Sequence, residues 1–290
     1  MAATARRLSG RSRRTSALLL MLPALAVVLV FFVYPVIALS ARSFLEPEPG
    51  VSQYVSLFAD GTTRTILVRT LVVAALVTAV TLVLAYPYAY LMSLSGPGVR
   101  ALLLFLVLLP FWSSLMARTF AWIVLLQPRG IVATLLSSIG LGGVPLLGSQ
   151  VGVTIAMTQV LLPFMVLPLF NTMVRIDRRL LSAAHSMGAS KFRALVRVFV
   201  PLSMPGVAAG CVIVFVLSIG FWVTPRLIGS PQQSLIGQLI ETKVGTLLDF
   251  AGAGAISVLL LVITAVLLLV AGAGARLLLG SPDSGGRNDE

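Results

Sequence analysis

Six apolar runs, each long enough to cross a lipid bilayer, constrain this sequence more than any other feature. Their residue ranges are 17–41, 66–94, 101–126, 151–173, 204–228 and 251–279. A helix that spans the hydrocarbon core needs about 20 apolar residues. Within each run the apolar residues are continuous and do not alternate with polar ones, which excludes the strands of a membrane β-barrel. We therefore expect an all-α, polytopic membrane protein with six transmembrane helices.

The net charge of the chain is +12, although 58% of its residues are hydrophobic and only 10% are charged. A soluble domain does not have this composition. Arginines in short loops between apolar runs follow the positive-inside rule and contact anionic lipid headgroups. The charge therefore predicts membrane lipid, and no nucleic acid, as a partner. The single cysteine, Cys211, lies inside an apolar run, so we expect no disulfide.

The basic residues are divided unequally between the two sides of the predicted membrane. About twice as many lie on the side of the amino terminus as on the other side, which predicts that both termini are cytoplasmic. We expect a basic segment at 1–16, a six-helix membrane domain at 17–279 and a polar tail at 280–290. The first run is longer than the ~7–15 apolar residues of a signal peptide, so we expect it to remain as an uncleaved span.

Three of the polar segments that join the runs differ in character. The segments 42–64 and 229–249 contain acids and turn-forming residues, and we expect both to be loops on the outer side. The segment 174–203, called the bracket below, is strongly basic and lies on the cytoplasmic side of the predicted topology.

The bracket has the pattern of two short helices joined at a glycine. Apolar residues recur at helical spacing in its first half, at Ile176, Leu180, Ala183, Ala184 and Met187. Gly188 breaks this helix and Ser190 caps a second one, which Pro201 and Pro205 are expected to end. One face of the second helix is lined by Phe192, Leu195, Val196 and Phe199. We expect this face to present an apolar ridge to a partner.

The bracket resembles the EAA loop of ABC importer permeases, which seats in a groove of the ATPase subunit and transmits its motion. The family's Glu-Ala-Ala triplet, glycine and proline correspond in spacing to Ser182-Ala183-Ala184, Gly188 and Pro201. The resemblance implies that ATPase coupling is carried by Ser182, Ala183, Ala184, His185, Met187, Gly188, Ala189 and Pro201. Serine at position 182 departs from the usual glutamate, which removes the acid for a salt bridge to the ATPase.

The same resemblance implies a type I ABC importer permease (MetI-like) fold in a bacterial inner membrane. It also implies three kinds of partner: ABC ATPase subunits, a second and different permease subunit that completes a heterodimer, and a periplasmic or lipid-anchored solute-binding protein. The chain itself has no G-x-x-x-x-G-K-[ST] phosphate loop. We therefore expect no cofactor in this chain, with ATP bound by the partner ATPase.

Enzymatic chemistry has little support in the residues. His185 is the only histidine and lies in the bracket, so we expect no metal site, and the HExxH and GxSxG motifs are absent. A secondary transporter stays open as an alternative, although no acid lies at mid-depth in any run to relay ions. A membrane anchor or assembly factor also stays open, and co-purification of an ATPase would separate these alternatives from an importer subunit.

Polar and aromatic residues inside the runs are candidates for a translocation path, because polar side chains are costly in hydrocarbon. The candidates are Trp112, Arg118, Thr119, Trp122, Gln159, Asn171, Phe221, Trp222 and Thr224. Arg118 can equally be an anchor that reaches the membrane surface, and Phe221 and Trp222 can equally belong to a lipid-facing aromatic belt. We expect Gly220–Pro225 to break a helix near the outer side, which is tolerated where backbone lines a cavity.

A second resemblance concerns the transported solute. The stretches 108–130, 159–190 and 218–229 are similar to spermidine/putrescine permeases of the PotB kind. This likeness implies a polyamine as the solute. Phe221 stands where that subfamily commonly has an acid, and permeases for an amino-acid derivative, an opine or an iron chelate remain alternatives.

Overall fold

The computed structural model describes residues 21–46, 49–138, 140, 143 and 145–279. Helices make up most of this part of the chain and it contains no strand, which confirms the predicted all-α class. Five of its helices are long and apolar enough to span a membrane, and a bent pair of helices supplies a sixth candidate. The expected segments 1–16 and 280–290, and the start of the first run, lie outside the described residues.

The chain forms two compact units. Unit 1 comprises the residues up to Ala59 together with Thr242–Leu260, and unit 2 comprises Asp60–Glu241 together with the residues from Leu261. The helices of unit 1 are the first span Met21–Leu45, with the π turn η1 (Leu29–Val33) and α2 (Tyr34–Leu45), then α3 (Ser52–Ala59) and the start of α14 (Phe250–Leu279).

Close backbone contact and one side-chain pair organise unit 1. A Cβ atom at Gly254 would lie 2.5 Å from the Leu39 carbonyl oxygen, so only glycine lets α14 approach α2 at this point. The hydroxyl oxygens of Ser43 and Tyr54 lie 2.8 Å apart and join α2 to α3.

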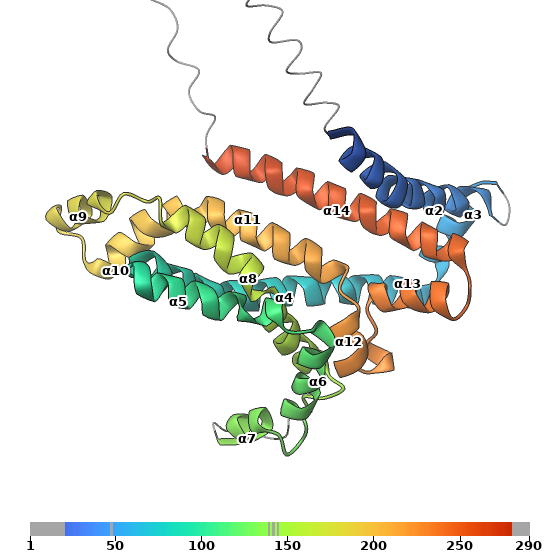
Figure 1. Ribbon diagram of the computed structural model, residues 1–290, viewed down its shortest axis with the longest axis horizontal. Coiled ribbons are helices and arrows are strands. Elements are labelled where there is room, and N and C mark those ends of the chain that lie inside the picture. The colour runs from blue at the N-terminus through green and yellow to red at the C-terminus, as the bar shows by residue number, and fades with distance from the viewer. Residues whose placement is uncertain (1–20, 47–48, 139, 141–142, 144, 280–290) are drawn as a thin grey trace, which may run out of the picture. The chain divides into compact units, whose positions relative to one another are not determined.

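Unit 2 is built on three long helices that pack against one another (Figure 1): α4 (Gly61–Leu94), α8 (Gln150–Met173) and α11 (Val200–Ile219). The first of them begins at Asp60, whose carboxylate accepts the N–H groups of Thr62 and Thr63, each at 3.0 Å. The Thr63 hydroxyl and these two N–H groups lower the pKa of Asp60 from its usual value.

Small residues of α11 bring it close to α8. A Cβ atom at Gly206 would lie 2.7 Å from the Thr172 hydroxyl oxygen and 3.0 Å from the Pro168 carbonyl oxygen. At Gly210 it would lie 2.6 Å from the Met165 sulfur. Close approach through glycine is how membrane helices gain van der Waals contact without a hydrophobic driving force.

The two segments expected to be outer loops both contain short helices. Helix α3 lies in 42–64, and 229–249 contains the 3-10 turn η4 (Pro231–Gln233) and α13 (Ile236–Gly245). Ile236 is fully buried, and its N–H donates to the Thr70 hydroxyl of α4 at 2.9 Å. The sequence analysis did not identify these short helices, because they lie among turn-forming residues and gain their stability from packing.

The third run is not the continuous span that the sequence predicted. It consists of α5 (Pro97–Leu108) with the 3-10 turn η2 (Leu109–Trp112), and of α6 (Leu115–Leu125), which meet at an angle of 99°. Ser113 and Ser114 are extended at the break. The break leaves backbone carbonyls without helical hydrogen bonds. The Arg118 guanidinium donates to two of them, those of Pro110 and Ser113.

The fifth span also departs from its predicted boundaries. Pro201 and Pro205 do not end the second bracket helix, because a continuous helix runs from Lys191 to Ile219. The π turn η3 (Leu195–Phe199) precedes Pro201, and Val200 donates its N–H to Leu195. Since Pro201 has no N–H to donate, this wider turn accommodates the interruption without ending the helix.

The fifth span ends at Ile219 and not at residue 228 as expected. The chain breaks at Gly220 and resumes as α12 (Val223–Ile228). The predicted break within Gly220–Pro225 is confirmed, although Thr224 and Pro225 belong to the new helix.

Replacing Gly206 with valine tests the contact between α11 and α8. The added carbons meet Thr172 and the Pro168 carbonyl, so we expect a loss of about 1–3 kcal/mol of stability, as for other overpacked cores. Ala209→Val is the matched control, because Ala209 is exposed on the same helix. Thermal unfolding in detergent, followed by tryptophan fluorescence, should show a lowered midpoint for Gly206→Val alone. Equal midpoints for the two variants would contradict the close contact.

Candidate functional site

The turn at Gly188 closes the first bracket helix, α9 (Arg179–Ser186), with a Schellman motif. Gly188 donates its N–H to the His185 carbonyl at 2.9 Å, and Ala189 donates to the Ala184 carbonyl at 3.0 Å. The φ angle of Gly188 is +84°, a left-handed conformation that favours glycine. The predicted helix break is confirmed, and this geometry explains the need for glycine there.

The second bracket helix begins where the sequence predicts. The Ser190 hydroxyl accepts the Arg193 N–H at 3.3 Å and caps α10 (Lys191–Ala194). The Asp177 carboxylate accepts the Arg179 N–H at 2.9 Å at the start of α9. Each bracket helix therefore has its own acceptor at its amino-terminal end, and local bonds fix the shape of the bracket.

Two large apolar side chains protrude from the bracket. Met187 is 89% exposed and Phe192 is 75% exposed. The other coupling candidates are exposed at Ser182, Ala183, His185, Gly188 and Pro201 and half-buried at Ala184 and Ala189. The predicted apolar ridge is only partly right, because Phe199 is buried and its ring lies 5.0 Å from that of Tyr90. This helix continues into α11, so one of its faces packs on the core.

The bracket is also bonded to the end of α4. The Arg178 guanidinium donates to the Ser93 carbonyl oxygen at 2.5 Å. Ser93 lies in the last turn of α4, where unpaired carbonyls and the helix dipole attract a cation. The two residues are 85 positions apart, and no pattern in the sequence connects them. Arg178 therefore links the bracket to the helical core of unit 2.

Four of the nine path candidates lie on α6, α8 and α12 and pair across these helices. Figure 1 shows α6 and α12 at the other end of unit 2 from α9. The hydroxyl oxygens of Thr119 in α6 and Thr224 in α12 lie 3.5 Å apart, and both residues are buried. The Trp122 ring N–H donates to the Gln159 amide oxygen of α8 at 3.3 Å. These residues, called the polar cluster below, join three helices with hydroxyl and amide groups.

The remaining path candidates do not join the polar cluster. Arg118 is bonded to the break between α5 and α6, and Trp112 is exposed with its ring 5.8 Å from that of Phe105. Asn171 and Trp222 are exposed, and Phe221 is half-buried. Arg118 thus has a structural role that neither of its two expected interpretations included.

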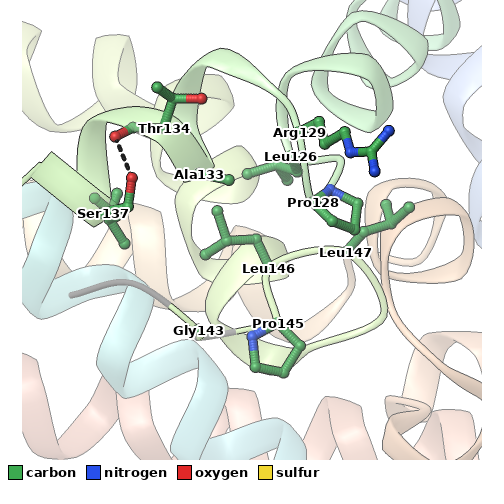
Figure 2. A pocket seen from close by; sticks show the side chains of 11 residues that line it. Leu126, Pro128, Arg129, Ala133, Thr134, Ser137, Gly143, Pro145, Leu146 and Leu147 are labelled. Carbon is green, nitrogen blue, oxygen red and sulfur yellow. Dashed lines mark hydrogen bonds between the residues drawn. The ribbon is translucent and has the colours of Figure 1, made fainter.

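A cavity of about 520 Å³ lies in the segment that joins α6 to α8 (Figure 2). Leu126, Leu146 and Ala133 line it together with polar residues of α7 (Ile131–Ser138), where the Ser137 hydroxyl donates to the Thr134 carbonyl at 2.7 Å. No predicted path residue lines this cavity.

No protein-family model matches the chain. Over 253 residues the chain is 34% identical to the spermidine/putrescine transport system permease protein PotB of Haemophilus influenzae, and the match covers 83% of this chain and 88% of that protein. The PotB protein of Escherichia coli is 32% identical over 260 residues, with 86% and 94% covered. The chain belongs to the PotB family of ABC importer permeases.

This PotB-family chain is also 30% identical over 217 residues to the inner membrane ABC transporter permease protein YdcU of Escherichia coli, covering 70% of this chain and 69% of that protein. Its fold matches the crystal structure of a bacterial ABC transporter that imports the acidic polysaccharide alginate, with a TM-score of 0.68 at 21% identity over 93% of this chain and 98% of that chain. The alginate transporter in complex with a pentasaccharide-bound periplasmic protein gives a TM-score of 0.71 at 20% identity over 93% and 97%.

These findings confirm the predicted family, fold and transport role. The PotB-family chain is a permease subunit of an ABC importer and a multi-pass protein of the inner membrane. They give no support to the secondary transporter or the membrane anchor that the sequence left open.

Replacing Arg178 with alanine tests its bond to α4. We expect faster amide hydrogen exchange in α9, in α10 and in the last turn of α4, because the bracket loses its tie to the core. Arg179→Ala is the control, since Arg179 is exposed and the structure gives its guanidinium no bond among the described residues. Unchanged exchange in Arg178→Ala would show that the bond does not hold the bracket.

Proposed function

We propose that this PotB-family permease carries a polyamine, spermidine or putrescine, into the cell. The observation that carries this proposal is the identity of 34% and 32%, over more than four fifths of the chain, to two proteins named as spermidine/putrescine permeases. The resemblance of three stretches of the sequence to that subfamily supports the same solute.

The proposed importer has further subunits. ATP is bound and hydrolysed in separate ATPase chains, since this sequence has no phosphate loop. A second, different permease chain completes the path, and a periplasmic or lipid-anchored protein delivers the solute. A periplasmic protein bound to the similar alginate transporter supports this arrangement. Both termini and the bracket lie in the cytoplasm, in keeping with the charge bias of the loops.

The bracket would couple ATP hydrolysis to transport. Met187 and Phe192 seat in a groove of the ATPase, whose movement displaces the bracket. Because Arg178 and the packing of Phe199 on Tyr90 join the bracket to the core, the core would move with it and open the path on alternate sides. The driving force is the difference in contact free energy between the two states, and not chemistry in this chain.

The polar cluster would form part of the path. It offers a polyamine the hydroxyl groups of Thr119 and Thr224 and the amide oxygen of Gln159, while α6, α8 and α12 contain no acid. The carboxylates that pair with the ammonium groups of the polyamine would come from the second permease chain or from the outer segments 42–64 and 229–249.

Phe221 favours a second candidate, an importer for a different small solute. It replaces the acid expected in a polyamine permease with an apolar ring, which suits a less strongly cationic molecule. Amino-acid derivatives, opines and iron chelates are the classes that remain.

Replacing Gly188 with valine should uncouple ATP hydrolysis from uptake. A β-branched residue cannot adopt a φ of +84° without strain, so the turn that fixes Met187 is lost. Gly98→Val is the matched control, because Gly98 has an ordinary backbone conformation and open space around it. Uptake and ATPase activity are measured in proteoliposomes of the complete transporter. Normal coupling in Gly188→Val would count against the bracket's role.

Uptake of labelled putrescine and spermidine at low external concentration tests the solute. Cells that lack this chain, and every other polyamine importer, should lose ATP-dependent uptake. The wild-type chain should restore uptake, whereas Gly188→Val should not. Restored uptake of a different solute class, with no polyamine uptake, would replace the polyamine with the second candidate and leave the permease role intact.

A further inference from the structure

The bracket surface is strongly basic. Six cationic side chains lie on it, all exposed: Arg175, Arg178, Arg179, Lys191, Arg193 and Arg197. Asp177 is its only acid, and its carboxylate is bonded to the Arg179 N–H within the bracket. Cations therefore outnumber acids six to one on the bracket, which favours a partner surface of the opposite charge.

Apolar groups stand in the middle of this charged surface. Met187 and Phe192 flank the Gly188 turn and are among the most exposed large apolar side chains of the described residues. The Schellman bonds of Gly188 and Ala189 and the Ser190 cap hold the backbone on which they sit. Rigid, exposed apolar side chains ringed by charge are typical of a protein docking surface.

The position of the bracket favours a protein over lipid headgroups. Figure 1 shows α9 beyond the ends of α8 and α11, within unit 2, so that it projects past the helices that span the membrane. A helix that binds a lipid surface instead lies flush with the interface and turns its apolar face into it.

We infer that the bracket binds an ATPase whose groove has an apolar floor and an acidic rim, and that charge attraction selects this partner. This inference rests on the proposed coupling role and adds the chemistry of the partner. Met187 and Phe192 fill the floor, and the cations around them pair with carboxylates of the rim. Serine at position 182 belongs to this arrangement, because an acid there would face the acidic rim.

Binding of the separately purified ATPase subunit of the same transporter to the full chain in zwitterionic lipid nanodiscs tests the inference. Affinity should fall about tenfold between low and high salt, because exposed charge pairs are screened. Lys191→Glu combined with Arg193→Glu should weaken binding about tenfold at low salt and by less at high salt. Ser182→Glu should weaken binding about two- to threefold, since it places a like charge against the rim.

Two further sets of variants serve as controls. Arg64→Glu combined with Arg129→Glu makes the same change in net charge on exposed residues outside the bracket, and it should leave the affinity unchanged. Met187→Ala and Phe192→Ala should weaken binding equally at all salt concentrations, because apolar contacts are not screened.

The outcomes separate the two proposals. Failure of the wild-type chain to bind the ATPase overturns the coupling role and this inference with it. If the affinity for the ATPase does not change with salt or with charge reversal, or if it rises with Ser182→Glu, the coupling role stays intact and the inference is overturned. Anionic nanodiscs provide the last test: if the cations bind headgroups instead, anionic lipid should weaken ATPase binding and charge reversal should restore it, which also overturns the inference.

Discussion

Hydrocarbon offers no partner to a backbone N–H or C=O group, so every interruption of a helix in this chain needs a substitute for the lost bond. The structure supplies different substitutes at three places, two interruptions and one helix end. Arg118 donates to the carbonyls freed between α5 and α6, and a π turn precedes Pro201. Arg178 donates to a carbonyl at the end of α4. Two arginines that cost free energy near a membrane are thus explained by the backbone groups that they satisfy.

The contacts between the bracket and the core explain how movement of the bracket can reach the transmembrane helices. Its inner side is bonded and packed against α4, through Arg178 on Ser93 and Phe199 on Tyr90, and its second helix continues into α11 without a break. Its outer side carries Met187 and Phe192, which have no packing role in the described residues. A force applied to the outer side therefore has a route to the core through this bond and these packed rings.

The sequence predicted those features that follow from local patterns. The apolar runs predicted the fold class, and Gly188 and Ser190 predicted the bracket's turn and cap. The bend at Ser113 was not predictable from hydrophobicity, since both halves of the run are equally apolar. The sequence analysis wrongly ended the second bracket helix at Pro201. It applied the rule that proline ends a helix and left out the free-energy cost of unpaired backbone groups at a membrane. The polar cluster and the Arg178 bond join residues 37 to 105 positions apart, and no local pattern specifies such pairs.

The central claim is that the bracket and α4 move as one body during transport. A distance measurement between spin labels at Ser186 in α9 and Leu94 at the end of α4 tests it, with Cys211 replaced by alanine in the complete transporter. Both labelled positions are exposed, so the labels leave the core packing unchanged. The account predicts one narrow distance distribution that is the same with and without ATP. A distribution that shifts or broadens when ATP binds would show that the bracket moves independently of the core and would contradict the account.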